Sequence, residues 1–296
     1  MLNEIVESYD DHFSKELNEA KKHKGQIRIA AAIRYFLNSS SLIRKRSEHL
    51  FKKINEKVVI GKVQEYYSVR CVPQILGPIL DTIDNASEVL LNEINSVSDN
   101  PIIDMETENV YHGGNFHGDY VSFEMDKLKI AVTKLSMLSE RQLNFLMNDK
   151  LNGKLPPFIN LGILGLNFGM QGLQYTATST TAENQTLSYP MYLHSIPNNN
   201  DNQDIVSMGS NSALLAKKVI DNSYTVLAIE IIAILQAIDY LGCCNELSKY
   251  TMNIFNDLRN IAPKFIEDKP MSDTIEEIKR YIINKDAVDL DTITEN

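Results

Sequence analysis

The sequence lacks several features that would identify a secreted, metal-binding or nucleic-acid-binding protein. It has no Trp and three Cys, of which Cys243 and Cys244 are neighbours. Neighbouring cysteines are poorly placed to bridge each other and no zinc-type spacing occurs, so we expect reduced thiols, no metal site and a cytoplasmic protein. Lys and Arg number 29 against 39 Asp and Glu, for a formal net charge of -10. That balance disfavours a nucleic-acid partner, because a phosphate backbone requires a basic face.

Other absences narrow the function further. The apolar stretch at residues 228–237 is short and is interrupted by Glu230 and Gln236, so we expect no membrane span. The acidic N-terminus follows a helical pattern rather than that of a signal peptide. No phosphate-binding glycine motif and no nucleophile elbow occur, which disfavours a nucleotide-binding enzyme and a serine hydrolase.

Helical periodicity dominates what is present, and we predict an all-α fold over residues 1–296. Two segments, about 119–150 and 210–241, contain no Gly or Pro and carry apolar residues at three- and four-residue steps. Helices of that length, roughly 45–50 Å at 1.5 Å per residue, fit a bundle. Between them, residues 153–203 contain Pro and several Gly, which predicts a loop-rich region with a functional role. Shorter helices are expected at 3–22, 26–37, 42–54, 79–94 and 273–283, and short extended pieces at 102–111 and around Tyr192.

The segment VQEYYSVRCVPQ, residues 63–74, concentrates chemically active side chains. Arg70 offers a planar fork of donors that fits a carboxylate bidentately. Tyr67 lies three residues before it and can reach the same bound molecule. This pattern is typical of a site that clamps an amino-acid carboxylate, although Tyr and Arg are also common on ordinary packed surfaces.

Two polar loops each precede a long helical segment. GGNFHG, residues 113–118, places Phe116 and His117 on a flexible turn, and NNNDNQDIVSMG, residues 198–209, contains Gln203. Either loop could face a ligand at a helix N-terminus, and either also fits an ordinary helix cap. His112 and His117 do not share a helical face and have no accompanying carboxylates, so they do not predict a metal site.

In this order, these pieces resemble the aromatic amino acid ammonia-lyase family, which includes histidine, phenylalanine and tyrosine ammonia-lyases and the related 2,3-aminomutases. The matching stretches are Gly25-Gln26 with Ala30-Ala31, QEYYSVRCVPQ, NSVSDNP, GGNFHG and NQDIVSMG. The resemblance implies a long-helix bundle at the core of a cytoplasmic tetramer that removes ammonia from an amino acid. It implies that Arg70 clamps the substrate carboxylate and that Tyr67 lies beside the electrophile. It also implies that Gln64 and Phe116 line the pocket, that Gln203 meets the substrate side chain, and that several subunits build each site.

One departure from the family concerns the electrophile, a methylidene-imidazolone (MIO) made from an internal Ala-Ser-Gly. This sequence contains no Ala-Ser-Gly and resembles only the C-terminal part of the family. We therefore expect the isolated chain to be inactive and the MIO to be carried by a companion N-terminal chain, unless the chain is a fragment or a relic. The alternatives are a 2,3-aminomutase half, or a non-catalytic helical scaffold or regulatory subunit.

The other departures concern substrate choice and positioning. Histidine-specific members usually carry Glu where this chain has Gln203, and a neutral amide suits an aromatic ring or phenol better than an imidazole. Gln203 therefore favours phenylalanine or tyrosine, whereas the surrounding VSMG resembles the histidine branch. Glu65 stands where the family usually has Asp.

Overall fold

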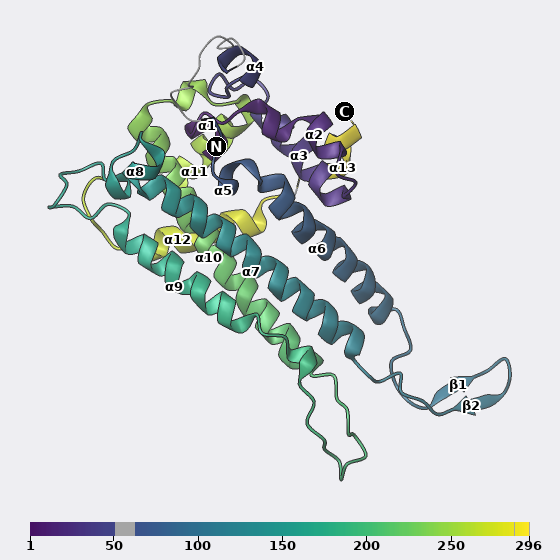
Figure 1. Ribbon diagram of the computed structural model, residues 1–296. Coiled ribbons are helices and arrows are strands. Elements are labelled where there is room, and N and C mark those ends of the chain that lie inside the picture. The colour runs from purple at the N-terminus through teal and green to yellow at the C-terminus, as the bar shows by residue number, and fades with distance from the viewer. Residues whose placement is uncertain (51–62, 287, 296) are drawn as a thin grey trace.

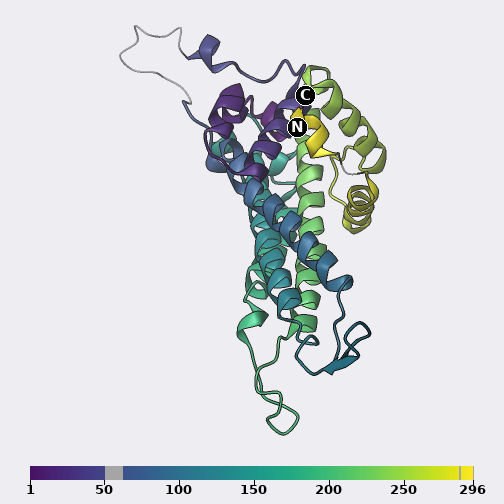
Figure 2. The ribbon, with the colours of Figure 1, turned by 90° about the vertical axis from the view of Figure 1, so that its right-hand side faces the viewer.

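The computed structural model describes residues 1–50, 63–286 and 288–295. It confirms the all-α fold: apart from one two-stranded hairpin, the regular structure of these residues is helical. Figure 1 shows an elongated bundle with smaller helices gathered at one end and two loops extending from the other. In Figures 1 and 2 both termini lie at the end with the smaller helices.

The bundle is built around α7 (Asp119–Met147) and α10 (Gly209–Leu241), which pack along each other. Sequence periodicity predicts the first of these helices to residue 150, but it ends at Met147. Asn148 has extended backbone, and its side chain accepts a hydrogen bond from the Lys150 N–H at 3.1 Å, which starts the short α8 (Asp149–Asn152). α10 ends at Leu241, and the next residue, Gly242, has a left-handed backbone (φ 64°) that glycine adopts without the cost of a side chain.

The core follows the middle of α10. Val226, Ile229, Leu235 and Ile238 are completely buried there. By length and composition α10 could cross a membrane, so the argument from the short stretch at 228–237 does not extend to the whole helix, and the absence of a membrane span stays a prediction. Most of its apolar part is buried. α10 packs against α7, α9 (Gln171–Leu187) and α12 (Ser272–Asn284), and in this fold it is the central helix of the bundle.

The flanking helices partly differ from expectation. α6 (Val72–Ile94) begins seven residues before the expected 79, with Pro73 in its first turn. α9 (Gln171–Leu187) occupies part of the region expected to be loop-rich, so that description of residues 153–203 is wrong over this helix. Its sequence is rich in Thr and Gln and has little apolar periodicity. Burial of Asn184 holds it in place: the Asn184 amide donates to Ser136 and Ser223, each at 3.2 Å.

The N-terminal layer is not the single helix expected at 3–22. The chain forms α1 (Leu2–Ile5), a 3-10 turn η1 (Asp10–Phe13) and α2 (Lys15–Glu19). Extended backbone at Tyr9 and Ser14 interrupts the helix; Tyr9 bridges to Arg44, and the Ser14 hydroxyl caps α2. Residues 51–54 of the predicted helix at 42–54 lie outside the described residues. Within 42–50 only α4 (Arg46–His49) is helical, and residues 42–45 are not, because Arg44 bridges to Tyr9.

The remaining elements are short or lie near the C-terminus. The extended excursion expected at 102–111 is an antiparallel hairpin, β1 (Ile102–Asp104) and β2 (Asn109–Tyr111). Tyr192 lies in a 3-10 turn, η4 (Met191–Leu193), rather than in a strand, because its N–H donates to Asp126 of α7 at 2.7 Å. The others are α3 (Lys24–Leu37), α5 (Tyr67–Arg70), η3 (Pro157–Ile159), η5 (Cys244–Glu246), α11 (Lys249–Ile261), α12 (Ser272–Asn284) and α13 (Leu290–Glu295).

Candidate active site

Tyr67 and Arg70 lie together on α5, a single helical turn in front of α6. The Arg70 guanidinium carbon is 4.8 Å from the centre of the Tyr67 ring. Tyr67 is 69% exposed, so its phenol is free to meet a bound molecule. The Arg70 Nε is buried and has no hydrogen-bond partner among the described residues. A buried guanidinium nitrogen left without an acceptor is costly, and the carboxylate of a ligand could supply that acceptor.

The residues around this pair fasten it to the bundle. The ring of Tyr66 lies 5.5 Å from that of Phe145, and the Ser68 carbonyl accepts a 2.6 Å hydrogen bond from the side chain of Gln142, both on α7. Gln64 is exposed on the same stretch. The sequence-predicted group of Gln64, Tyr67 and Arg70 therefore shares one exposed, well-anchored segment.

Phe116 and Gln203 form a second group. Both line a hollow of about 410 Å³ where the loop before α7 meets the loop before α10. Phe116 is 56% exposed, and a backbone bridge between Asn198 and Gln203 shapes the second loop. Asn202 and His117 also line this hollow. Because Phe116 is exposed, the loop before α7 does not bury its aromatic ring, and its role as a ligand-facing loop stays a prediction.

A buried ion pair holds the chain that leads to the Gln203 loop. Lys129 is fully buried, lies 2.7 Å from Asp126 and donates to the Tyr189 carbonyl at 2.9 Å. Asp126 also accepts from Ser212 on α10 and from the Tyr192 N–H. Burial alone would raise the pKa of Asp126, but the hydrogen bonds from Lys129, Ser212 and the backbone outweigh it and lower that pKa below its usual value.

The two groups of site residues lie toward opposite ends of the bundle (Figure 1). α5 precedes α6, whereas Phe116 follows the hairpin beyond the far end of α6. With 23 residues, α6 separates them by roughly 35 Å at 1.5 Å per residue. One chain therefore brings Tyr67 and Arg70 together, and Phe116 and Gln203 together, but does not bring the two pairs to one point.

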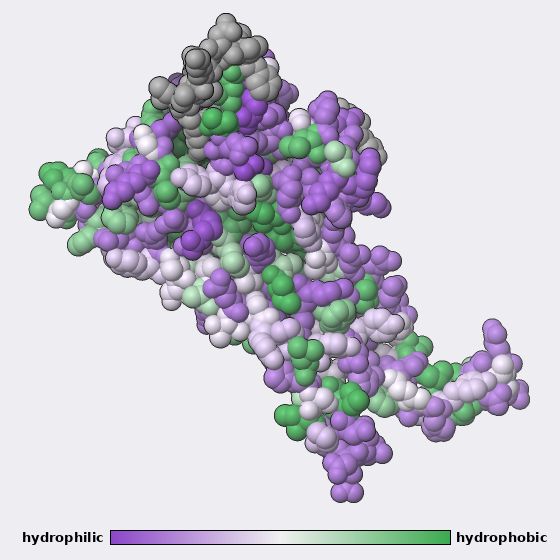
Figure 3. Space-filling view, viewed as in Figure 1, coloured by the Kyte–Doolittle hydropathy of each residue, from purple (hydrophilic) through white to green (hydrophobic). Residues whose placement is uncertain are grey.

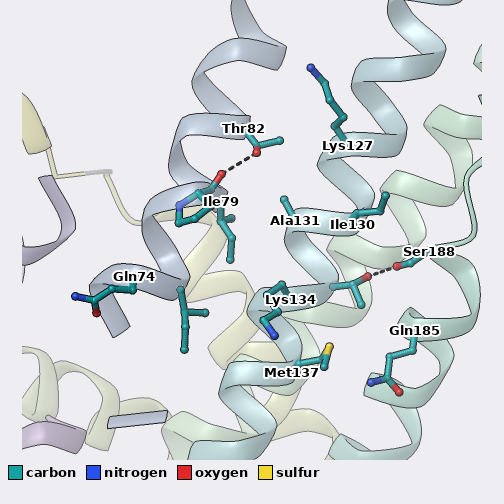
Figure 4. A pocket seen from close by; sticks show the side chains of 13 residues that line it. Gln74, Ile79, Thr82, Lys127, Ile130, Ala131, Lys134, Met137, Gln185 and Ser188 are labelled. Atoms are coloured by element: carbon teal, nitrogen blue, oxygen red, sulfur yellow. Dashed lines mark hydrogen bonds between the residues drawn. The ribbon is translucent and has the colours of Figure 1, made fainter. Parts of the chain in front are cut away.

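A larger groove runs along the side of the bundle between α6, α7 and α9. Its volume is about 680 Å³, and Figure 4 shows Ile79, Ile130 and Met137 among the apolar side chains that line it. It contains none of the five predicted site residues. Figure 3 also shows a hydrophobic tip at the loop before α9, where four side chains are 65–73% exposed: Ile163, Leu164, Leu166 and Phe168.

Sequence reasoning missed two residues beside the Tyr67–Arg70 segment. His12 hydrogen-bonds Glu65, and Arg46 donates to the Val63 carbonyl. The role of His12 was missed because a single helix was expected at 3–22. The turn that contains His12 has no sequence signal beyond a polar, charged stretch. Within the described residues, no group of three or more His, Cys, Asp or Glu could hold a metal ion. The three cysteines are free.

Comparisons with known proteins identify the family of this chain. Residues 1–260 match the family model for aromatic amino acid lyases. The chain is 40% identical to a tyrosine ammonia-lyase of Cupriavidus metallidurans over 87% of this chain and 49% of that protein, and 36% identical to a histidine ammonia-lyase of Bacillus subtilis over 92% and 51%. The solved phenylalanine aminomutase of Pantoea agglomerans superposes with a TM-score of 0.90 at 36% identity, over 96% of this chain and 56% of that one. The chain thus spans about half the length of the relatives it matches. The match of residues 1–260 to the family model and the shared long-helix bundle show that the chain belongs to the aromatic amino acid lyase family.

Proposed function

We propose that this chain is the C-terminal half of an aromatic amino acid ammonia-lyase, which eliminates ammonia from an amino acid to give an unsaturated acid. The observation that carries the proposal is the Tyr67–Arg70 pair. A guanidinium with a buried, unpartnered nitrogen lies 4.8 Å from an exposed phenol ring. This is the chemistry needed to hold a carboxylate next to a group that binds or moves a proton.

In this proposal Arg70 binds the substrate carboxylate and fixes the orientation of the α-carbon. Tyr67 lies beside the reacting centre, where its hydroxyl supports proton transfer or binding. Neither residue supplies an electron sink, and a proton next to a carboxylate is only weakly acidic. The chain has no Ala-Ser-Gly, so its residues cannot form the MIO electrophile. We propose that a companion N-terminal chain carries the MIO, which supplies the electrophile when bound.

The complete site requires more than one copy of this chain. Gln64, Tyr67 and Arg70 lie about one helix length from Phe116 and Gln203. We propose that a second copy, packed antiparallel, supplies the missing pair within a homo- or hetero-tetramer. Exposed apolar side chains along the bundle, including Ile83 and Ile130, support burial against another copy. A cytoplasmic location and the absence of membrane and nucleic-acid partners stay predictions.

For the substrate, we propose phenylalanine or tyrosine ahead of histidine. Gln203 lines the same hollow as Phe116, and a neutral amide can face an aromatic ring or a phenol without burying an unpaired charge. A 2,3-aminomutase is a second candidate, since aminomutases occur among the relatives and one of them shares the fold at a TM-score of 0.90. The two activities differ in whether the ammonia is released or added back to the substrate.

The test is co-purification of the chain with its native companion, followed by product analysis on Phe, Tyr and His. An unsaturated acid supports the lyase and a β-amino acid supports the aminomutase. A loss of two waters from the companion, detected by mass spectrometry, would identify the MIO. A complex that converts none of the three amino acids, and whose behaviour is unchanged by Arg70→Ala, would instead support a scaffold or regulatory role.

A further inference from the structure

Glu65 is the one buried carboxylate in the segment that carries the candidate site residues. It lies between the exposed side chains of Gln64 and Tyr66, is 5% exposed, and hydrogen-bonds the Nε2 of His12. His12 is itself 7% exposed. The contact joins η1 to a stretch 53 residues further along the chain. A hydrogen bond between two buried groups is electrostatically stronger than one at the surface.

A second contact holds the same stretch from the same side. Arg46 donates to the Val63 carbonyl at 2.8 Å and also pairs with Asp11, the residue before His12. Its guanidinium lies 4.1 Å from the ring centre of Tyr9. Gln64 is therefore flanked by two attachments, one through the Val63 backbone and one through the Glu65 side chain.

η1 is in turn fixed to the bundle. The Asn18 amide donates to the His12 carbonyl at 3.2 Å, and its oxygen accepts from Gln26 on α3 and Gln74 on α6. Gln74 lies in the first turn of α6, four residues after Arg70 of α5. The Asn18 network therefore links η1 to the chain that follows the site segment. On the opposite side, α7 holds it through Gln142 and Phe145.

We propose that His12 and Glu65 are positioning residues that hold Gln64, Tyr67 and Arg70 in the geometry the substrate requires. The resemblance places Asp at position 65; Glu is longer by one methylene, and here its buried carboxylate contacts His12. The inference rests on the proposed function, but the clamp, meaning the contact between His12 and Glu65, can be tested without measuring turnover.

The experiment combines hydrogen exchange of the full chain with kinetics of the reconstituted complex. His12→Ala and Glu65→Ala remove the contact, whereas His12→Gln keeps an N–H donor. His49→Ala is the control, because it removes a histidine of the same layer that bonds the Tyr9 hydroxyl at 2.6 Å. We expect both alanine variants to exchange about tenfold faster over residues 63–70 while α10 is unchanged. His12→Gln should restore most of the protection, and His49→Ala should leave residues 63–70 as they are.

In the reconstituted complex, His12→Ala should raise KM and lower kcat/KM by about ten- to a hundredfold, because misplacing a binding group by about 1 Å costs that much. Unchanged exchange over residues 63–70, or faster exchange spread equally over α10, would overturn the proposal. So would equal losses for His12→Ala and His12→Gln. If the wild-type complex has no turnover, the proposed function fails, whereas the exchange result still decides whether the clamp exists.

Discussion

Replacing Lys129 by Met should destabilise the chain strongly, because it breaks a buried ion pair from one side. Lys129 is fully buried and Asp126 is 2% exposed. The substitution nearly conserves volume, so it adds little packing strain. It removes the ammonium that lies 2.7 Å from Asp126 and donates to the Tyr189 carbonyl. Asp126 is then left as a buried carboxylate without its counter-charge.

The expected loss is about 3–5 kcal/mol in the free energy of unfolding. We expect the lower end, because Asp126 keeps the donors Ser212 and Tyr192 N–H. The double variant Lys129→Met with Asp126→Asn should recover all but about 1–2 kcal/mol. The neutral Asn still accepts from Tyr192, and its amide can donate to the Ser212 hydroxyl, which keeps its bond to the Ser122 carbonyl at 2.9 Å.

Urea unfolding of the purified chain, followed by circular dichroism, measures these differences. Lys134→Met provides the control, since Lys134 is exposed on the same helix, and it should change the free energy of unfolding by less than about 0.5 kcal/mol. A free energy of unfolding for Lys129→Met within about 1 kcal/mol of the wild-type value would contradict the reasoning. A double variant as unstable as Lys129→Met alone would show that charge burial is not the cause.

Three further outcomes follow from other parts of the molecule. Burial raises the pKa of Glu230 to about 7, although a hydrogen bond from Ser139 acts to lower it. The free energy of unfolding should therefore fall by about 3 kcal/mol as the pH rises from about 4.5 to 7, because the folded chain holds the proton more tightly than the unfolded chain. Glu230→Gln should remove this pH dependence in urea titrations. Gly25→Ala should lower the free energy of unfolding by about 3 kcal/mol or more, because its Cβ would lie 2.2 Å from the Gly77 carbonyl oxygen. Gly172→Ala would meet nothing within 4 Å and should be neutral or stabilising; thermal melts of the two variants compare these outcomes. In the reconstituted enzyme, Gln203→Glu should shift the kcat/KM ratio towards histidine by about tenfold or more, and an unchanged ratio would remove Gln203 from the substrate contact.

The sequence predicts the helices that depend on apolar periodicity. α7 and α10 carry apolar residues mainly at three- and four-residue steps, and their observed bounds fall within three residues of the expected ones at each end. α9 could not be predicted this way, because its buried contacts use amides and hydroxyls such as those of Asn184. The interruption of the helix expected at 3–22 could not be predicted either, because the tertiary contact between Tyr9 and Arg44 outweighs the local helical pattern.

The candidate site was predictable in composition but not in arrangement. Arg70 and Tyr67 are three residues apart, and one helical turn necessarily brings them together. The local sequence around Phe116 does not show that it lies about one helix length from Tyr67 and Arg70, because this separation depends on the length and direction of α6. The clamp by His12 joins residues 53 positions apart, and single-sequence patterns do not carry contacts of that range.

The most direct test of the account is a mixing experiment with two inactive variants. Arg70→Ala and Gln203→Ala are each assembled with the companion chain, and each complex should lose most of its turnover. Copies of the two variants are then co-assembled at equal ratio and the turnover is measured. If the two residues of one site come from different copies, random mixing leaves about a quarter of the sites with both wild-type residues, and about a quarter of the wild-type rate should return. Turnover that stays at the level of the separate variants would contradict a site shared between copies of this chain.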